Sequence, residues 1–207
     1  MTEMIDFAPQ ARLVAAVAAG VTDEQLEGAT PCPEYRVRHL LGHLIGLTGA
    51  FRDAARKDFG PHLDRDPGSV VPDIGPGWRA DLPKLLDELV EAWRDPSAWE
   101  GMTRAGGIDL PGAVAGAVAL DELVVHGWDL ARATGQAYEP DAMSLGVAKA
   151  LLTPEEPEQP EGGEVGAEGT GSGDSLFGAV FPVPEDASRL DRVIGLSGRD
   201  PGWTPAA

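Results

Sequence analysis

Apolar residues recur three and four positions apart along most of this 207-residue chain, which is the spacing of one face of an α-helix. The pattern predicts five helices, over about 6–19, 36–58, 78–94, 111–134 and 141–152. Gly20, Gly60-Pro61 and Gly135 follow three of them as stop signals. Pro83 falls in the first turns of the third and marks a second place at which it could begin.

A last short helix is predicted from Glu185 to about Ser197, after an extended stretch that includes Val180 and Phe181. Residues 95–110 are expected to be irregular, and no segment alternates for long enough to build a sheet. These elements predict an all-α fold. Its centre is an antiparallel four-helix bundle, with short additional helices and an extended C-terminal segment.

The amino-acid composition indicates a linker between two parts of the chain. Residues 155–174 hold seven acidic residues and no basic ones, among Pro, Gly, Ser and Thr. Such a segment buries too little apolar surface to order itself, so 153–174 is predicted to be an acidic disordered linker. It separates a predicted bundle domain, 1–152, from a C-terminal segment, 175–207, that is expected to dock on the bundle.

The charge balance excludes two classes of partner. With 16 basic and 34 acidic residues the net charge is -18, which argues against nucleic acid and anionic membranes. No apolar run is long enough to span a bilayer, and no secretory leader pattern is present, so a cytoplasmic protein is predicted. The single cysteine, Cys32, allows no intramolecular disulfide, and its setting favours a capped turn or core position over a reactive thiol.

Candidate chemistry begins with Glu122, His126 and Asp129, which interrupt the apolar fourth helix. Their spacing of four and three residues places all three side chains on one helix face. A carboxylate and an imidazole in an apolar stripe are costly unless they are paired or bind a metal.

The second predicted helix offers His39 and His43, with the small residues Gly46, Ala50 and Ala54 further along the face of His43. Bundles build metal sites from facing helices, so the simplest site combines His43, Glu122 and His126. Two imidazoles and one carboxylate suit Zn²⁺ with an open fourth position, and they also accept Fe(II) or Ni²⁺.

The remaining polar residues receive lesser roles. Asp129 would support a histidine N–H or act as a fourth ligand. His39 is predicted to lie in the first turn or at the surface, Asp121 to be solvated, and His62 to lie in a loop.

Two motifs resemble a known family. The stretch Thr30-Pro-Cys-Pro-Glu-Tyr-Arg-Val-Arg-His-Leu-Leu-Gly-His43 is similar to the second-helix signature of the DinB-like metalloproteins, in the branch related to the N-terminal domain of mycothiol-dependent maleylpyruvate isomerase. Glu122-Leu-Val-Val-His126-Gly-Trp-Asp129 resembles that branch's second metal motif. The tail from Phe181 to Arg192 and Gly198-Arg-Asp-Pro-Gly-Trp203 is similar to the ending of an actinobacterial metal-binding subgroup.

The resemblance covers most of 5–152 and 176–203. It implies a four-helix bundle that holds a divalent metal, usually zinc, on the residues that match by position: His43, Glu122 and His126. It also implies a thiol cosubstrate such as mycothiol, which the metal would activate for isomerisation or S-transfer.

Three functions stay open at this point. The first is a metal-dependent transferase or isomerase that uses a small-molecule thiol and an electrophilic substrate. The second is a metal-binding module without chemistry, with Asp129 closing the coordination shell. The third is a metalloenzyme of specialised metabolism that uses no thiol. A homodimer is also suggested, because Leu120 and Val124 are expected to form an apolar outer surface on the fourth helix.

Overall fold

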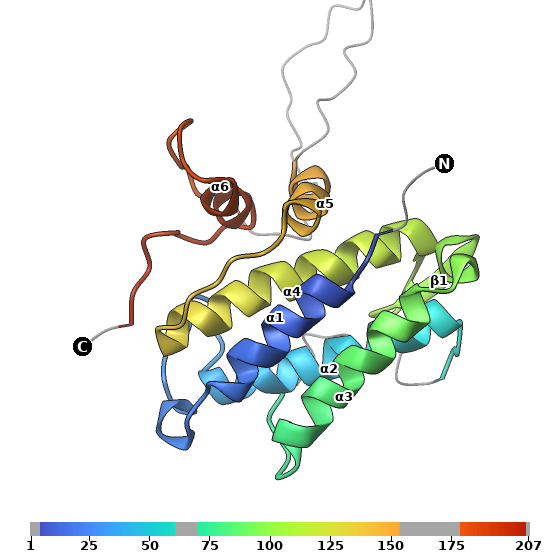
Figure 1. The fold of residues 1–207 in the computed structure, drawn as a ribbon, viewed down its shortest axis with the longest axis horizontal. Coiled ribbons are helices and arrows are strands. Elements are labelled where there is room, and N and C mark those ends of the chain that lie inside the picture. The colour runs from blue at the N-terminus through green and yellow to red at the C-terminus, as the bar shows by residue number, and fades with distance from the viewer. Residues whose placement is uncertain (1–4, 61–69, 154–178, 206–207) are drawn as a thin grey trace, which may run out of the picture.

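The computed structural model describes residues 5–60, 70–153 and 179–205, and within these ranges the fold is almost entirely helical. The α-helices are α1 (Ala8–Ala19), α2 (Val37–Arg56), α3 (Trp78–Trp93), α4 (Gly112–Thr134), α5 (Ala142–Leu152) and α6 (Arg189–Leu196). Short 3₁₀ turns lie at Asp23–Gln25 and Pro96–Trp99. The predicted all-α, DinB-like bundle is confirmed (Figure 1).

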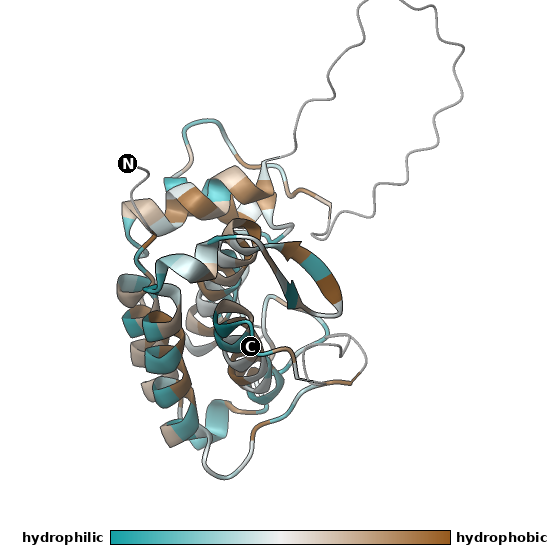
Figure 2. Ribbon diagram, turned by 90° about the vertical axis from the view of Figure 1, so that its right-hand side faces the viewer, coloured by the Kyte–Doolittle hydropathy of each residue, from teal (hydrophilic) through white to brown (hydrophobic). Residues whose placement is uncertain are grey.

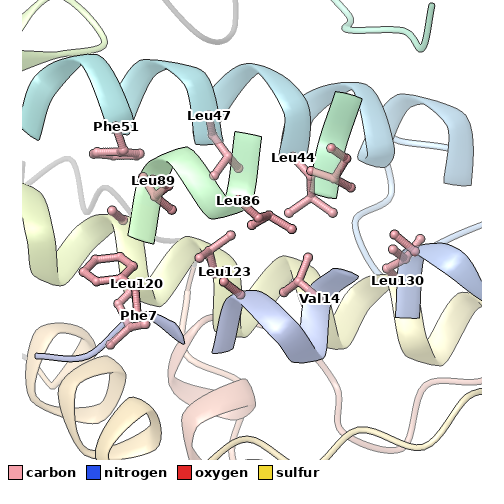
Figure 3. Packing of buried hydrophobic residues seen from close by; sticks show 14 of the residues in the cluster. Phe7, Val14, Leu44, Leu47, Phe51, Leu86, Leu89, Leu120, Leu123 and Leu130 are labelled. Atoms are coloured by element: carbon pink, nitrogen blue, oxygen red, sulfur yellow. The ribbon is translucent and has the colours of Figure 1, made fainter. Parts of the chain in front are cut away.

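The bundle is formed by α1 to α4, whose apolar stripes meet in one core. Leu44 and Leu47 of α2 point toward Leu86 and Leu89 of α3 and toward Leu123 of α4 (Figure 3). Most polar residues of α1, α2 and α3 lie on the outer faces of the helices, and both colours of the hydropathy scale appear along the helices in Figure 2. The helical spacing of the apolar residues therefore fixes which face of each helix turns inward.

Helix α4 is the exception, because it is buried on both sides. Helices α1, α2 and α3 lie on one side of it, and α5 and α6 lie on the other (Figure 1). Leu120 and Val124 are completely buried, Leu120 in the bundle core and Val124 beneath α5 and α6. The apolar outer surface expected at these two residues is therefore absent, because the chain covers it with its own later helices. The homodimer stays a prediction that has lost this support.

A small hairpin corrects the prediction that 95–110 is irregular. Strands β1 (Met102–Ala105) and β2 (Ile108–Pro111) pair antiparallel, with Met102 opposite Pro111 and Ala105 opposite Ile108 (Figure 2). Gly106 and Gly107 form the connection with φ angles of 58° and 78°, which are the positive values that a two-residue hairpin turn needs. The Gly-Gly dipeptide was the signal for this turn, but four-residue strands are too short to show an alternating pattern.

Helix α3 begins at Trp78, so Pro83 lies inside the helix rather than at its start. Trp78 and Leu82 are buried and anchor the first turns to the core, which outweighs the hydrogen bond that Pro83 cannot donate. The predicted last helix is present as α6.

The predicted linker, 153–174, falls almost wholly outside the described residues, as does His62, and the three-part division of the chain stays a prediction. Among the described residues, no helix combines the length and apolar content that a membrane crossing needs.

Candidate metal centre

The side chains of His43, Glu122 and His126 come together where α2 packs against α4. Nε2 of His43 lies 3.4 Å from Oε2 of Glu122, and Nε2 of His126 lies 3.2 Å from the same oxygen. One ligand atom from each residue lies within 4.8 Å of the other two, and the two imidazole rings meet edge to face with centroids 4.7 Å apart. The structure therefore brings together the three residues that the sequence singled out.

The spacing of these atoms suits a metal ion. Donor atoms at about 2.0–2.1 Å from a tetrahedral zinc ion lie about 3.3–3.4 Å from one another. The two imidazole–carboxylate distances, 3.4 and 3.2 Å, match this separation. Two imidazoles and a carboxylate are also a common zinc ligand set, so the residues fit a divalent metal in both geometry and chemistry.

Without a metal, the cluster is a network of charges. Burial alone would raise the pKa of Glu122, but the hydrogen bonds from His126 and His43 hold it well below its usual range. Burial would lower the pKa of His126, but Asp129 and Glu122 raise it to about 9. In the metal-free protein, the protonated imidazole of His126 thus supplies the positive charge beside Glu122 that a metal ion would otherwise supply.

Asp129 lies on the opposite side of the His126 ring from Glu122. Its Oδ2 is 2.9 Å from Nδ1 of His126, while Nε2 of that ring faces Glu122. Asp129 is completely buried and does not share the position at which the three ligand atoms converge. The geometry favours the first of its two predicted roles, in which it holds the ring of His126 in place.

Arg199 completes this arrangement and was missed by sequence reasoning. Its Nη2 lies 3.2 Å from Oδ2 of Asp129, and its Nε lies 3.4 Å from Oδ1. The two residues are 70 positions apart, and Arg199 stands in an irregular segment after α6, so no helical spacing pointed to the pairing. The resemblance of the tail to a metal-binding subgroup was the one signal that this segment matters.

The entrance to the cluster is lined by α2. The side chain of His43 is 18% exposed and that of Glu122 is 25% exposed, so solvent reaches both. Gly46, one turn after His43, is exposed, and a Cβ there would meet no described atom within 4 Å. The ring of Tyr35 lies 5.5 Å from that of His43. Among the described residues, the cluster is thus most accessible on the side of His43 and Glu122.

Cys32 lies in a turn near this entrance. Its backbone N–H donates to Oγ1 of Thr30, and the Thr30 hydroxyl donates in turn to the Cys32 carbonyl. Burial, and then the nearby charge of Asp129, raise the pKa of the thiol above its usual value. The capped-turn interpretation of Cys32 therefore agrees with its surroundings, which keep the thiol protonated.

Two other polar residues can be placed. His39 is part of the first turn of α2, where its Nδ1 accepts a hydrogen bond from the backbone of Arg36, as expected. The expectation that Asp121 is solvated was wrong, because it is 1% exposed and its Oδ1 has no partner among the described residues. Asp121 stands one turn before Val124, which packs beneath α5 and α6. Burial, and then the charge of Glu122, raise the pKa of Asp121 to about 8.

Comparison with known proteins identifies the family. Residues 7–131 match the family described as the mycothiol maleylpyruvate isomerase N-terminal domain. Since the match spans more than half of the chain, this protein belongs to that family, and the resemblance drawn from its motifs is confirmed.

The protein is also similar to uncharacterized proteins of two strains of Mycobacterium tuberculosis. Each is 28% identical over 145 residues, which cover 68% of this chain and 74% of the relative. No solved structure matches significantly.

Proposed function

We propose that this protein holds a zinc ion on His43, Glu122 and His126 and uses it with a small-molecule thiol, such as mycothiol, to transfer sulfur or isomerise an electrophilic substrate. The observation that carries the proposal is the convergence of three ligand atoms within 4.8 Å of one another, with both imidazole nitrogens 3.2–3.4 Å from the same carboxylate oxygen of Glu122. The choice of thiol is supported by the family to which the chain belongs, because that family is named after a mycothiol-dependent isomerase.

The shape of the site supports chemistry rather than a purely structural ion. Three protein ligands leave one position of a tetrahedral ion for water or substrate. Asp129 is engaged by His126 and Arg199, so it is not placed to fill that position. A bound zinc ion supplies a Lewis-acid position that lowers the pKa of a coordinated thiol or water.

The residues around the ion have separate tasks. His43 and Glu122 face the solvent-accessible side, where a thiol would approach. Gly46, one turn from His43, adds no side chain that would crowd this approach. His126 and Asp129 lie deeper and hold the ligand set in one orientation.

The metal site is tested by zinc binding in single variants of the full chain. His43→Ala is expected to lower zinc affinity at least 100-fold, because two ligands remain. The matched control is His39→Ala, which removes a histidine one turn earlier on α2 and outside the cluster. Equal zinc affinity in the two variants would contradict the assignment.

The thiol is tested separately. The zinc-loaded protein is incubated with mycothiol and a panel of electrophiles, including maleylpyruvate, and thiol consumption or product isomerisation is followed against a His43→Ala control. Turnover that needs both zinc and thiol supports the proposal. Turnover without thiol would favour the thiol-independent metalloenzyme, and a metal that binds without any turnover would favour the non-catalytic module.

A further inference from the structure

The C-terminal segment sends one charged side chain into the bundle. The side chain of Arg199 is only 18% exposed. Its guanidinium contacts both carboxylate oxygens of Asp129. Asp129 is completely buried, and its Oδ2 contacts both Arg199 and Nδ1 of His126. A chain of contacts therefore runs from Arg199 through Asp129 to His126.

The local structure after α6 fixes Arg199 in this position. Gly198 has a φ of 82°, a conformation that favours glycine, and its N–H donates to the carbonyl of Gly195. The N–H of Arg199 donates to the carbonyl of Ile194, which completes a Schellman ending. Ile194 is itself completely buried in the bundle core. The guanidinium is thus aimed at Asp129 by a helix end that is anchored in the core.

Metal binding makes this contact more important. A histidine that coordinates through Nε2 is neutral and keeps its remaining proton on Nδ1, where Asp129 accepts it. Asp129 then faces a neutral ring rather than an imidazolium. A buried carboxylate without a compensating cation is costly, and Arg199 is the cation that the described structure places against it.

We propose that Arg199 is a positioning residue of the metal site: it holds the buried Asp129 carboxylate in the orientation that fixes the ring of His126. This inference rests on the proposed function, since it takes His126 as a metal ligand. Arg199 lies outside the residues that match the family domain, 7–131, in the C-terminal segment.

The direction of the effect separates positioning from simple electrostatics. A cation near a divalent metal repels it, so the loss of the Arg199 charge would by itself strengthen metal binding. The loss of a group that orients a ligand weakens metal binding, typically by about 10–100-fold. The two explanations therefore predict opposite signs.

The test measures zinc affinity of full-length Arg199→Ala and Arg199→Lys by competition with a chromophoric chelator. We expect Arg199→Ala to weaken zinc binding by about tenfold or more, as for other residues that orient a metal ligand. Arg199→Lys keeps the charge but loses the fork that contacts both oxygens, so it should restore binding only in part. The matched control is Arg132→Ala. Arg132 also holds the C-terminal segment, through the carbonyl of Pro201, but has no contact with Asp129 among those described.

A second readout needs no metal. In the metal-free protein, NMR follows the exchange with solvent of the proton on Nδ1 of His126, which should become faster in Arg199→Ala and stay unchanged in Arg132→Ala. Zinc binding as tight as wild type in Arg199→Ala, or an equal loss in Arg132→Ala, would overturn the inference. If the wild-type protein bound no zinc, the proposed function would fail, and an unchanged exchange rate in Arg199→Ala would then refute the positioning of His126 as well.

Discussion

The two sides of helix α4 show two ways of using a buried surface. On the side that faces the core, Leu120, Leu123 and Leu130 pack among leucines of the neighbouring helices (Figure 3). Along the polar stripe of α4 that meets His43 and Arg199, His126 and Asp129 are buried and Glu122 is partly exposed, and their charges must be balanced. The first side stabilises the fold through burial of apolar area, whereas the second is organised around what it binds.

The core leucines and the polar residues of the cluster differ in what a substitution removes. A core leucine contributes through area and shape, so its loss lowers stability but leaves the remaining structure in place. Each polar residue of the other side has a particular partner, and removing one leaves another buried charge without compensation. Substitutions on the two sides should therefore separate stability from metal binding.

The largest effect on stability is expected from Leu123→Ala. Leu123 is completely buried in the core, so its truncation should lower the free energy of unfolding by about 2–5 kcal/mol. Chemical denaturation measures this change, and zinc stoichiometry of the folded variant should stay at the wild-type value. Loss of zinc from a variant that is still folded would show that the two sides of α4 are not independent.

On the other side, Glu122→Gln should lower zinc affinity by about 100-fold or more, because it replaces a charged metal ligand with a neutral amide. The matched control is Glu91→Gln on α3, whose side chain is 66% exposed and pairs with Arg94 outside the metal cluster. Calorimetric titration compares the two. A similar zinc affinity in both variants would remove Glu122 from the ligand set.

The pH dependence should follow His126. Its pKa in the metal-free protein is raised to about 9, so between about pH 7 and 9 zinc must displace a proton from it. Zinc affinity should therefore rise with pH, by about tenfold per unit, and level off above the pKa. Titration in buffers of different ionisation enthalpy should show about one proton released per zinc ion at pH 7.5. Zinc binding that is independent of pH in this range would contradict the role of His126.

The stability of the metal-free protein should depend on pH in the opposite direction to zinc affinity. Because the pKa of His126 is raised above its ordinary value of 6.5, its pairing contributes fully to stability below that value. This contribution is lost as the pH rises through about 9. Metal-free protein should thus become less stable over the same interval in which zinc binds more tightly.

Much of the bundle and of the site followed from local spacing. Apolar residues at helical intervals predicted α1 to α4, and the four-residue separation of Glu122 and His126 placed both on one face. The pairing with His43 required two helices to meet in a particular register, which spacing alone does not fix. That pairing came from the combined motifs and is now seen in the distances.

What the sequence did not reveal depends on contacts between distant segments. Asp121 and Val124 were expected at the surface, but both are buried, and Val124 lies beneath helices α5 and α6. Arg199 reaches Asp129 because the end of α6 is anchored in the core, and no local pattern records that approach. Burial of α4 beneath α5 and α6 is a tertiary property, and the expectation that Val124 is exposed failed there.

The proposed zinc site is tested most directly by X-ray absorption at the zinc edge on the full-length protein loaded with one equivalent of zinc. We predict two imidazole nitrogens, one carboxylate oxygen and one exchangeable light-atom ligand, which a thiol replaces with a sulfur at about 2.3 Å. A coordination shell filled by four protein ligands, unchanged when thiol is added, would contradict it.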